Sequence, residues 1–206
     1  MNEKPILFNS EMVNAILSGR KTMTRRIISE KTLHLFDVAA SAGECHPLEL
    51  CDQRSQSYYL EFCPLGKPGD QLWVRECFRV HSRATDVATL VYRASERNSW
   101  TEQTRRVPVS DCNRPVSPEK WTPSIHMPRW ASRINLLITG VRVERLNTIS
   151  TGDAMAEGYP AEREATVGNL DAWLWFRELW DGIYPDNTFE VNPWCWVIEF
   201  ERMEAK

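Results

Sequence analysis

The sequence of 206 residues has no long hydrophobic run, and even the apolar-rich segment INLLITGV at 134–141 is short. A helix that crosses a bilayer needs about 20 consecutive apolar residues, so no transmembrane segment is predicted. The first residues, MNEKPILFNSEM, also lack the apolar region of a secretory signal peptide. We therefore expect a soluble, cytoplasmic protein that has no membrane partner.

The chain also has little excess charge, because 25 Lys and Arg residues against 28 Asp and Glu residues give a formal net charge of −3. This balance excludes a bulk polycation that binds duplex nucleic acid through its overall charge. Any contact with nucleic acid must then come from a local basic patch.

The cysteines lack the regular paired spacing of a structural zinc site. Cys45, His46, Cys51 and Cys63 come close together, but no orderly second pair completes a tetrahedral set of ligands. Without an export signal, six cysteines are most simply free thiols in a reducing compartment. We favour free thiols over zinc, and the sequence predicts no metal or other cofactor.

Internal repeats, low-complexity tracts and a regular alternation of strands with helices are absent as well. A hydrophobic content of 42% and nine tryptophans nonetheless indicate a folded core. Several short strands with helices between them predict an α+β fold, namely a small, mostly antiparallel β-barrel with flanking helices. We expect one domain over residues 1–206, with polar, loop-like insertions at 29–60 and 96–118. The apolar periodicity predicts strands at 5–8, 71–80, 89–95, 132–146 and 194–203, and helices at 9–19, 150–158 and 169–182.

The segment GRKTMTRR at 19–26 is the first candidate for chemistry. Lys21 lies among arginines, and nearby like charges lower the pKa of a lysine, which then serves as a general base or nucleophile. A solvated basic turn is the commoner fate of such a run. Thr24 needs a base to become a nucleophile, and in a regular strand positions 21 and 24 face opposite sides. The pair works only if Lys21 lies in the turn after Gly19; otherwise Thr24 is an ordinary strand residue.

Two carboxylates stand out from their local patterns. Glu157 ends the predicted helix at 150–158, where a negative charge opposes the helix dipole. It is either an exposed, energetically neutral residue or the partner of a nearby cation. Glu76 shares one face of the predicted strand at 71–80 with apolar side chains, whereas Trp73 lies on the opposite face.

The segment WTPSIHMPRWASR at 121–133 combines cations with aromatic side chains. Arginine grips phosphate and tryptophan stacks on bases, so Arg129, Trp130 and Arg133 are candidate nucleotide-binding residues. A structural loop with a buried tryptophan is an equally good interpretation.

Taken together, the segments GRKTMTRR, GKPGDQLWVRE, PSIHMPRWASRI, VERLNTISTGDAMAEG and LWDGIYPDN…NPWCWVIEF resemble the ASCH family, a branch of the PUA-like superfamily that is associated with RNA. They cover about two-thirds of the chain and are similar to a prophage-type subgroup. The resemblance implies a β-barrel with flanking helices and a cleft beside the first helix. Small ASCH enzymes that deacetylate N(4)-acetylcytidine use a lysine and a threonine of a GRKTxT motif and a later glutamate. Carried over by motif, these catalytic residues are Lys21, Thr24 and Glu157.

Three functions follow as hypotheses. The first is an amidohydrolase that acts on N(4)-acetylcytidine or a related modified nucleoside and needs no cofactor. The second is a non-catalytic module that binds RNA or a modified nucleotide, and the third is a ribonuclease. The sequence has no clustered set of Asp, Glu and His residues for two metals, so metal-dependent cleavage ranks last. The candidate substrate-binding residues are Arg20, Arg26, Trp73, Glu76, Arg129, Trp130 and Arg133.

Overall fold

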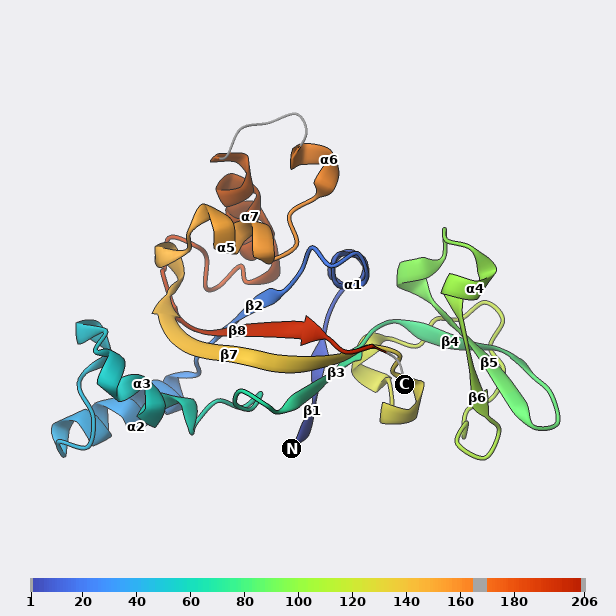
Figure 1. Ribbon diagram of the computed structural model, residues 1–206, viewed down its shortest axis with the longest axis horizontal. Coiled ribbons are helices and arrows are strands. Elements are labelled where there is room, and N and C mark those ends of the chain that lie inside the picture. The colour runs from blue at the N-terminus through green and yellow to red at the C-terminus, as the bar shows by residue number, and fades with distance from the viewer. Residues whose placement is uncertain (1, 165–169, 205–206) are drawn as a thin grey trace. The chain divides into compact units, whose positions relative to one another are not determined.

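The computed structural model describes residues 2–164 and 170–204, which separate into two compact units (Figure 1). The first unit comprises residues 1–19, 71–137 and 202–206, and the second comprises residues 20–70 and 138–201. Each unit combines helices with β-strands.

The first unit contains two sheets. β1 pairs in parallel with β3, β3 pairs antiparallel with the first residues of β7, and a separate antiparallel sheet has the order β4-β5-β6. The elements of this unit are β1 (Glu3–Leu7), α1 (Ser10–Leu17), β3 (Gln71–Arg75), β4 (Phe78–Arg83), β5 (Val87–Tyr92), α4 (Trp100–Gln103), β6 (Thr104–Pro108) and the start of β7 (Asn135–Arg145).

The helix α1 begins and ends as predicted. The side chain of Asn9 accepts a hydrogen bond from the backbone N–H of Met12, which caps the first turn. Gly19 follows with a φ of +77°, a conformation that favours glycine after a helix end. Val13 and Ile16 lie on the buried face of the helix.

The predicted strand at 71–80 is wrong, because two strands of different sheets take its place. β3 ends at Arg75 and β4 begins at Phe78. The alternation of buried and partly exposed residues continues across Glu76 and Cys77, so the sequence pattern hides the break. The β4-β5-β6 sheet covers a core of its own, which includes Phe78, Leu90 and Met127.

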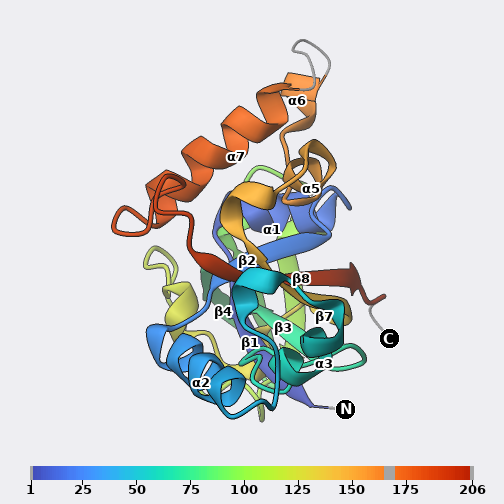
Figure 2. The same cartoon turned by 90° about the vertical axis from the view of Figure 1, so that its left-hand side faces the viewer.

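The second unit is built around three neighbouring strands in the order β7-β8-β2. β2 pairs antiparallel with β8, and this register places Thr24 opposite Ile198. The helices α5 and α7 pack together, as Figures 1 and 2 both show, over a core that includes Leu146, Phe176 and Trp180. The elements are β2 (Met23–Ile27), α2 (Glu30–Ser41), α3 (Gln53–Leu60), the rest of β7, α5 (Thr151–Ala156), α6 (Ala161–Glu164), α7 (Leu170–Ile183) and β8 (Trp194–Arg202).

The two polar segments are not the loops that the sequence suggests. Residues 29–60 contain α2 and α3, and residues 96–118 contain α4 and β6. In α2, the side chain of Ser29 caps the first turn, and Phe36 and Ala39 are buried on one side. So narrow an apolar stripe on a mostly polar helix gives only a weak periodic signal.

The predicted α+β class is confirmed, but closure into a barrel is not. β1 is an edge strand in the first unit and β2 is an edge strand in the second, so the described ladders are those of open sheets. The start of the predicted helix at 169–182 lies outside the described residues, and α7 is described from Leu170. None of the helices in the described part of the chain is long and apolar enough to cross a membrane.

Candidate functional site

The candidate site lies in the second unit, where the segment before β2 runs between the end of α5 and β8. The N–H of Thr22 donates to the carbonyl of Ala156 at 2.9 Å, and the N–H of Phe200 donates to the carbonyl of Thr22 at the same distance. Lys21 forms an isolated antiparallel bridge with Glu157. The backbone therefore brings two motifs together that are 136 residues apart.

The short helix α5 places Glu157. Ser150, the first residue of the predicted helix at 150–158, caps the first turn by accepting a hydrogen bond from the N–H of Asp153. Glu157 is the C-cap residue, and Gly158 follows with a φ of +106°, which turns the chain away from the helix. The glutamate thus lies at the predicted helix end, with its side chain directed at a cation.

Lys21 is buried, and hydrogen-bond acceptors surround its amine. Its Nζ donates to Oε2 of Glu157 at 2.7 Å, to the carbonyl of Glu157 at 2.8 Å and to the carbonyl of Met23 at 2.7 Å. These acceptors match the three N–H groups of an ammonium. Burial lowers the pKa of Lys21 below its usual value of 10.5, Glu157 opposes this effect, and Arg25 and Arg26 lower the pKa further. The predicted direction of the shift is therefore found, but burial is a larger cause than the neighbouring arginines.

A second buried cation holds the other oxygen of Glu157. Nη1 of Arg25 donates to Oε1 of Glu157 at 3.2 Å, and Nη2 donates to Asp153 at 2.7 Å. The guanidinium also lies 5.8 Å from the ring centroid of Phe176. Arg25 is only 2% exposed, and its Nε has no hydrogen-bond partner among the described residues. The Glu157 carboxylate therefore joins two buried cations.

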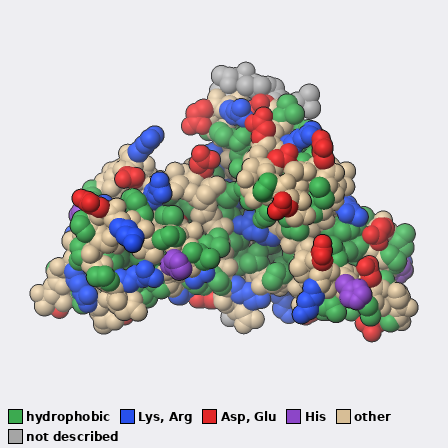
Figure 3. Space-filling view, turned by 180° about the vertical axis from the view of Figure 1, so that it is seen from behind, with side chains coloured by type: hydrophobic (Ala, Val, Ile, Leu, Met, Phe, Trp, Pro, Cys, Tyr) green, Lys and Arg blue, Asp and Glu red, His purple; other side chains and the backbone are tan. Residues whose placement is uncertain are grey.

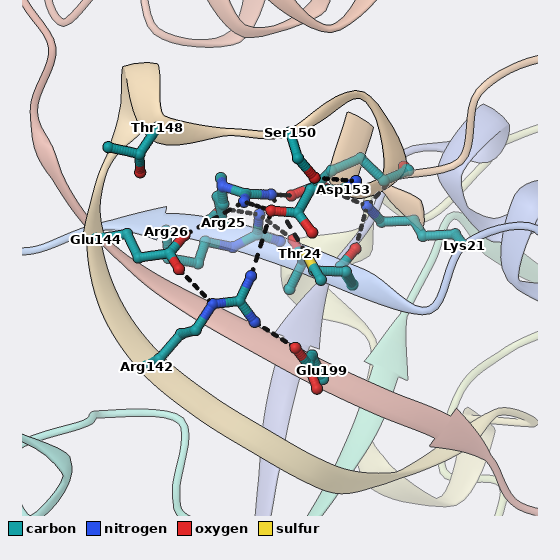
Figure 4. Close-up of polar contacts among 12 residues, drawn as sticks. Lys21, Thr24, Arg25, Arg26, Arg142, Glu144, Thr148, Ser150, Asp153 and Glu199 are labelled. Carbon is teal, nitrogen blue, oxygen red and sulfur yellow. Dashed lines mark hydrogen bonds and ion pairs between the residues drawn. The ribbon is translucent and has the colours of Figure 1, made fainter. Parts of the chain in front are cut away.

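Thr24 contacts Arg26, which lies two residues further along the chain. Its Oγ1 accepts a hydrogen bond from Nη1 of Arg26 at 2.9 Å, and Thr24 is 1% exposed. The contacts alternate along the chain, because Lys21 and Arg25 both bind Glu157 whereas Thr24 contacts Arg26. This period of two is that of an extended backbone. The described contacts thus form two neighbouring groups, one around Glu157 and one at the threonine hydroxyl. Figure 4 shows Lys21, Thr24, Arg25 and Arg26 of these groups.

An outer layer of charge surrounds Arg25 (Figure 4). Arg142, on β7, binds Glu144 at 2.5 Å and Asp153 at 3.3 Å, and it also pairs with Glu199 on β8. Asp153 accepts from both Arg25 and Arg142, so it links the buried cations to partly exposed ones. Alternating charges of this kind fix the side chains of three elements relative to one another.

Sequence reasoning missed Arg25 as a member of the site. It counted this arginine only as a charge that lowers the lysine pKa. The spacing of two between Lys21, Met23 and Arg25 is the signal that could have found it, since these positions share one face of an extended segment. Of the predicted binding residues, Arg26 and Arg20 lie in this unit, and Arg20 donates to the carbonyls of Gly158 and Tyr159.

The other predicted binding residues lie in the first unit, where Glu76 and Arg133 form a buried ion pair. Nε and Nη2 of Arg133 donate to the two carboxylate oxygens of Glu76 at 2.8 and 2.9 Å. Arg133 also donates to Ser95 and lies 4.1 Å from the ring centroid of Tyr92. Burial raises the pKa of Glu76 above its usual value, and Arg133 opposes that rise. The pair is thus already saturated by protein partners.

The remaining candidates in the first unit also have protein partners. Arg129 makes a two-bond ion pair with Glu3 at 2.9 and 3.1 Å, and its guanidinium lies 5.9 Å from the ring centroid of Trp73. Trp130 packs edge-on against Phe78, as its structural interpretation requires. Its Nε1 is buried and has no hydrogen-bond partner within the described chain.

The cysteines are free thiols. Cys45 is partly buried, Cys51 is exposed and Cys63 is buried. Over residues 2–164 and 170–204, no group of three or more His, Cys, Asp or Glu side chains is arranged to hold a metal ion.

Comparison with known proteins gives one weak likeness. No protein-family model matches the chain, and no curated protein matches it. The chain is similar to a solved structure described as "High resolution crystal structure of ASCH domain from Lactobacillus crispatus JV V101", with 12% identity and a TM-score of 0.40 over 98% of this chain and 79% of the other. At these values the likeness carries no conclusion about activity, so any function has to be inferred from the motif residues and their contacts.

Proposed function

We propose that this chain is an ASCH-type amidohydrolase that deacylates N(4)-acetylcytidine or a related modified nucleoside. The observation that supports this proposal is the 2.7 Å contact between Lys21 Nζ and Glu157 Oε2 in a site where both residues are buried. The motif resemblance names these two residues independently of any structure. Two sequence-distant residues with a predicted joint role are thus in direct contact.

The environment of Lys21 suits a base. A lysine whose pKa is lowered by burial spends a larger fraction of time as the neutral amine, which accepts a proton. In this scheme Lys21 takes the proton of a water molecule, or that of the Thr24 hydroxyl once the amine leaves its present acceptors and reaches that hydroxyl. Glu157 orients the amine and relays the proton.

The oxygen that loses its proton attacks the carbonyl carbon of the acyl group. The tetrahedral intermediate then breaks its C–N bond, and the exocyclic amine of cytosine leaves after it receives the proton. If Thr24 is the nucleophile, water hydrolyses the resulting ester in a second step. The hydrogen bond from Arg26 to Thr24 Oγ1 stabilises the alkoxide form, since a guanidinium donor favours a developing negative charge.

The resting arrangement sets one condition on this mechanism. The side chain of Lys21 has 0% exposure, and its amine contacts three protein acceptors. The amine therefore has to exchange at least one of these acceptors for substrate or water during turnover. The same arrangement favours a second function, a non-catalytic module for RNA or a modified nucleotide, in which Lys21, Glu157 and Arg25 only hold β2 against α5.

A chromatographic assay separates these functions. The chelator-treated protein is incubated with N(4)-acetylcytidine, both as a free nucleoside and within a single-stranded RNA, and release of cytidine is followed. We expect turnover by the wild type and by Lys31→Met, a control that removes an exposed lysine of α2. Lys21→Met and Thr24→Val should lose activity while they keep the native circular dichroism spectrum.

Absence of cytidine from folded wild-type protein would overturn the amidohydrolase proposal and leave the binding module. Cleavage of the RNA strand itself would identify the ribonuclease. Activity that survives in Lys21→Met would show that the lysine has a structural role.

A further inference from the structure

The positive charge of the chain is concentrated in the first unit. Residues 71–137 contain eleven lysines and arginines against six aspartates and glutamates, a net charge of +5 in a chain whose total is −3. Figure 3 shows Lys and Arg side chains spread over the region of β4, β5 and β6. A local basic surface of this kind is what a nearly neutral chain needs in order to bind a polyanion.

The arginines that the sequence favours for this role are neutralised. Arg129 is paired with Glu3 and Arg133 with Glu76. By contrast, no ion pair or side-chain hydrogen bond within the described chain involves four exposed arginines in the same unit, namely Arg83, Arg93, Arg97 and Arg106. Their charge is therefore open to an external partner.

The outer face of the β4-β5-β6 sheet carries one of these arginines together with aromatic side chains. Phe78 and Val80 of β4 point into the core, so Arg79 lies on the opposite face. Thr89 of β5 pairs with Arg106 of β6, which places Arg106 on this face as well, since Ala88 and Leu90 on either side of Thr89 are core residues.

Two tryptophans contact residues of β4. Trp100, on α4, packs edge-on against His81 of β4 with ring centroids 5.0 Å apart, and 53% of it stays exposed. Trp121 lies under the guanidinium of Arg79 at 5.1 Å. We define the outer face as Arg79, His81, Thr89, Arg106, Trp100 and Trp121.

We propose that this outer face binds single-stranded nucleic acid, with phosphate on Arg106 and a base stacked on Trp100. An exposed tryptophan and an unpaired arginine in the same unit offer the two contacts that a flexible single strand makes, whereas the bases of a duplex are stacked on each other. This site is distinct from the Lys21–Glu157 cluster and does not depend on the proposed function. If both proposals hold, the substrate is a modified base within a polynucleotide.

The test is fluorescence anisotropy with an end-labelled single-stranded RNA, a single-stranded DNA and a duplex of the same sequence. We expect the full chain to bind either single strand in low salt more tightly than the duplex. Trp100→Ala should weaken binding about 5- to 100-fold, which is the contribution of one base stacked on an aromatic side chain. Trp100→Phe should recover most of this affinity, because phenylalanine keeps an aromatic ring on which the base can stack. Arg106→Gln should lower the slope of log K against log salt by about 0.7, the value for one phosphate contact to a single strand.

Lys31→Gln is the matched control, because it removes one exposed positive charge from the second unit. A failure of the catalytic proposal leaves this test intact, because the test measures binding and not turnover. No binding in low salt, or equal affinities of Trp100→Ala, Arg106→Gln and Lys31→Gln, would overturn the proposal. If the protein binds the duplex and the single strands with equal affinity, the proposal that a base stacks on Trp100 is overturned.

Discussion

The replacement of Glu157 by glutamine should destabilise the fold more than the replacement of Lys21 by methionine. The two oxygens of the Glu157 carboxylate bind two different cations, Lys21 at 2.7 Å and Arg25 at 3.2 Å. Glutamine keeps the size of the side chain but removes the carboxylate that Lys21 contacts at 2.7 Å, whereas Arg25 keeps Asp153. Removing one partner of a buried ion pair costs about 3–5 kcal/mol.

Lys21→Met should cost less. In that variant Glu157 still binds Arg25, and methionine fills most of the space of the lysine stem. What remains is the loss of hydrogen bonds to Glu157 and to the carbonyl of Met23, which costs about 1–3 kcal/mol for groups left unsatisfied. The structure therefore predicts an order, with Glu157→Gln about 2 kcal/mol worse than Lys21→Met.

Urea unfolding followed by tryptophan fluorescence measures this order from the midpoints and slopes. Glu190→Gln is the control, because Glu190 pairs with Arg177 at the surface with an 80% exposed side chain, and its loss should change stability by less than about 1 kcal/mol. The double variant Lys21→Met/Glu157→Gln should be less unstable than the sum of the single variants, since the two residues touch. If Lys21→Met proves as costly as Glu157→Gln, or if the effects add, the account of a carboxylate that serves two cations is refuted.

Three further outcomes are expected in the second unit. Because the pKa of Lys21 is lowered in the folded state, the unfolded chain binds more protons than the folded chain at pH values between that lowered pKa and 10.5. The unfolding free energy of the wild type relative to Lys21→Met should therefore rise as the pH rises through this window. A difference that does not change with pH would contradict the lowered pKa. Burial raises the pKa of the Cys195 thiol to about 12, so native protein should react with a thiol reagent at exposed Cys51 and not at Cys195, which mass spectrometry of the labelled peptides checks. A Cβ at Gly140 would lie 2.7 Å from Oε2 of Glu199, so Gly140→Ala should destabilise the fold by about 1 kcal/mol. The second change Glu199→Ala should restore stability in thermal unfolding, and no recovery would show that the strain lies elsewhere.

The sequence predicts those elements whose signals are local. The cap of α1 at Asn9, the cap of α5 at Ser150 and the turn at Gly158 are all set by residues within four positions of each other. The break between β3 and β4 is not local. It follows from the pairing of each strand with a different partner, and the hydrophobic alternation that usually identifies a strand continues through it.

The same distinction explains the site. The GRKTMTRR and DAMAEG motifs identify Lys21 and Glu157, and the structure adds that they touch. Whether an arginine is free or neutralised depends on partners far away in the chain. Arg129 and Arg133 find their carboxylates 126 and 57 residues away, so no local pattern reveals that they are already paired.

Arg25 links the electrostatics of the cluster to the two functions proposed for Lys21. Its charge lowers the pKa of Lys21, yet it also fixes the carboxylate whose charge raises that pKa. A purely structural ion pair needs only the second effect, since a lysine whose charge is fully matched holds β2 against α5 most firmly. A base needs the first, because an amine that never loses its proton never accepts one. Arg25 is itself paired with Asp153 at 2.7 Å and lies 3.6 Å from Glu144, so burial of the amine lowers the pKa of Lys21 more than Arg25 does. The lowered pKa, which burial sets and Arg25 reinforces, is the property that a base at this position would need and that a purely structural pair would not.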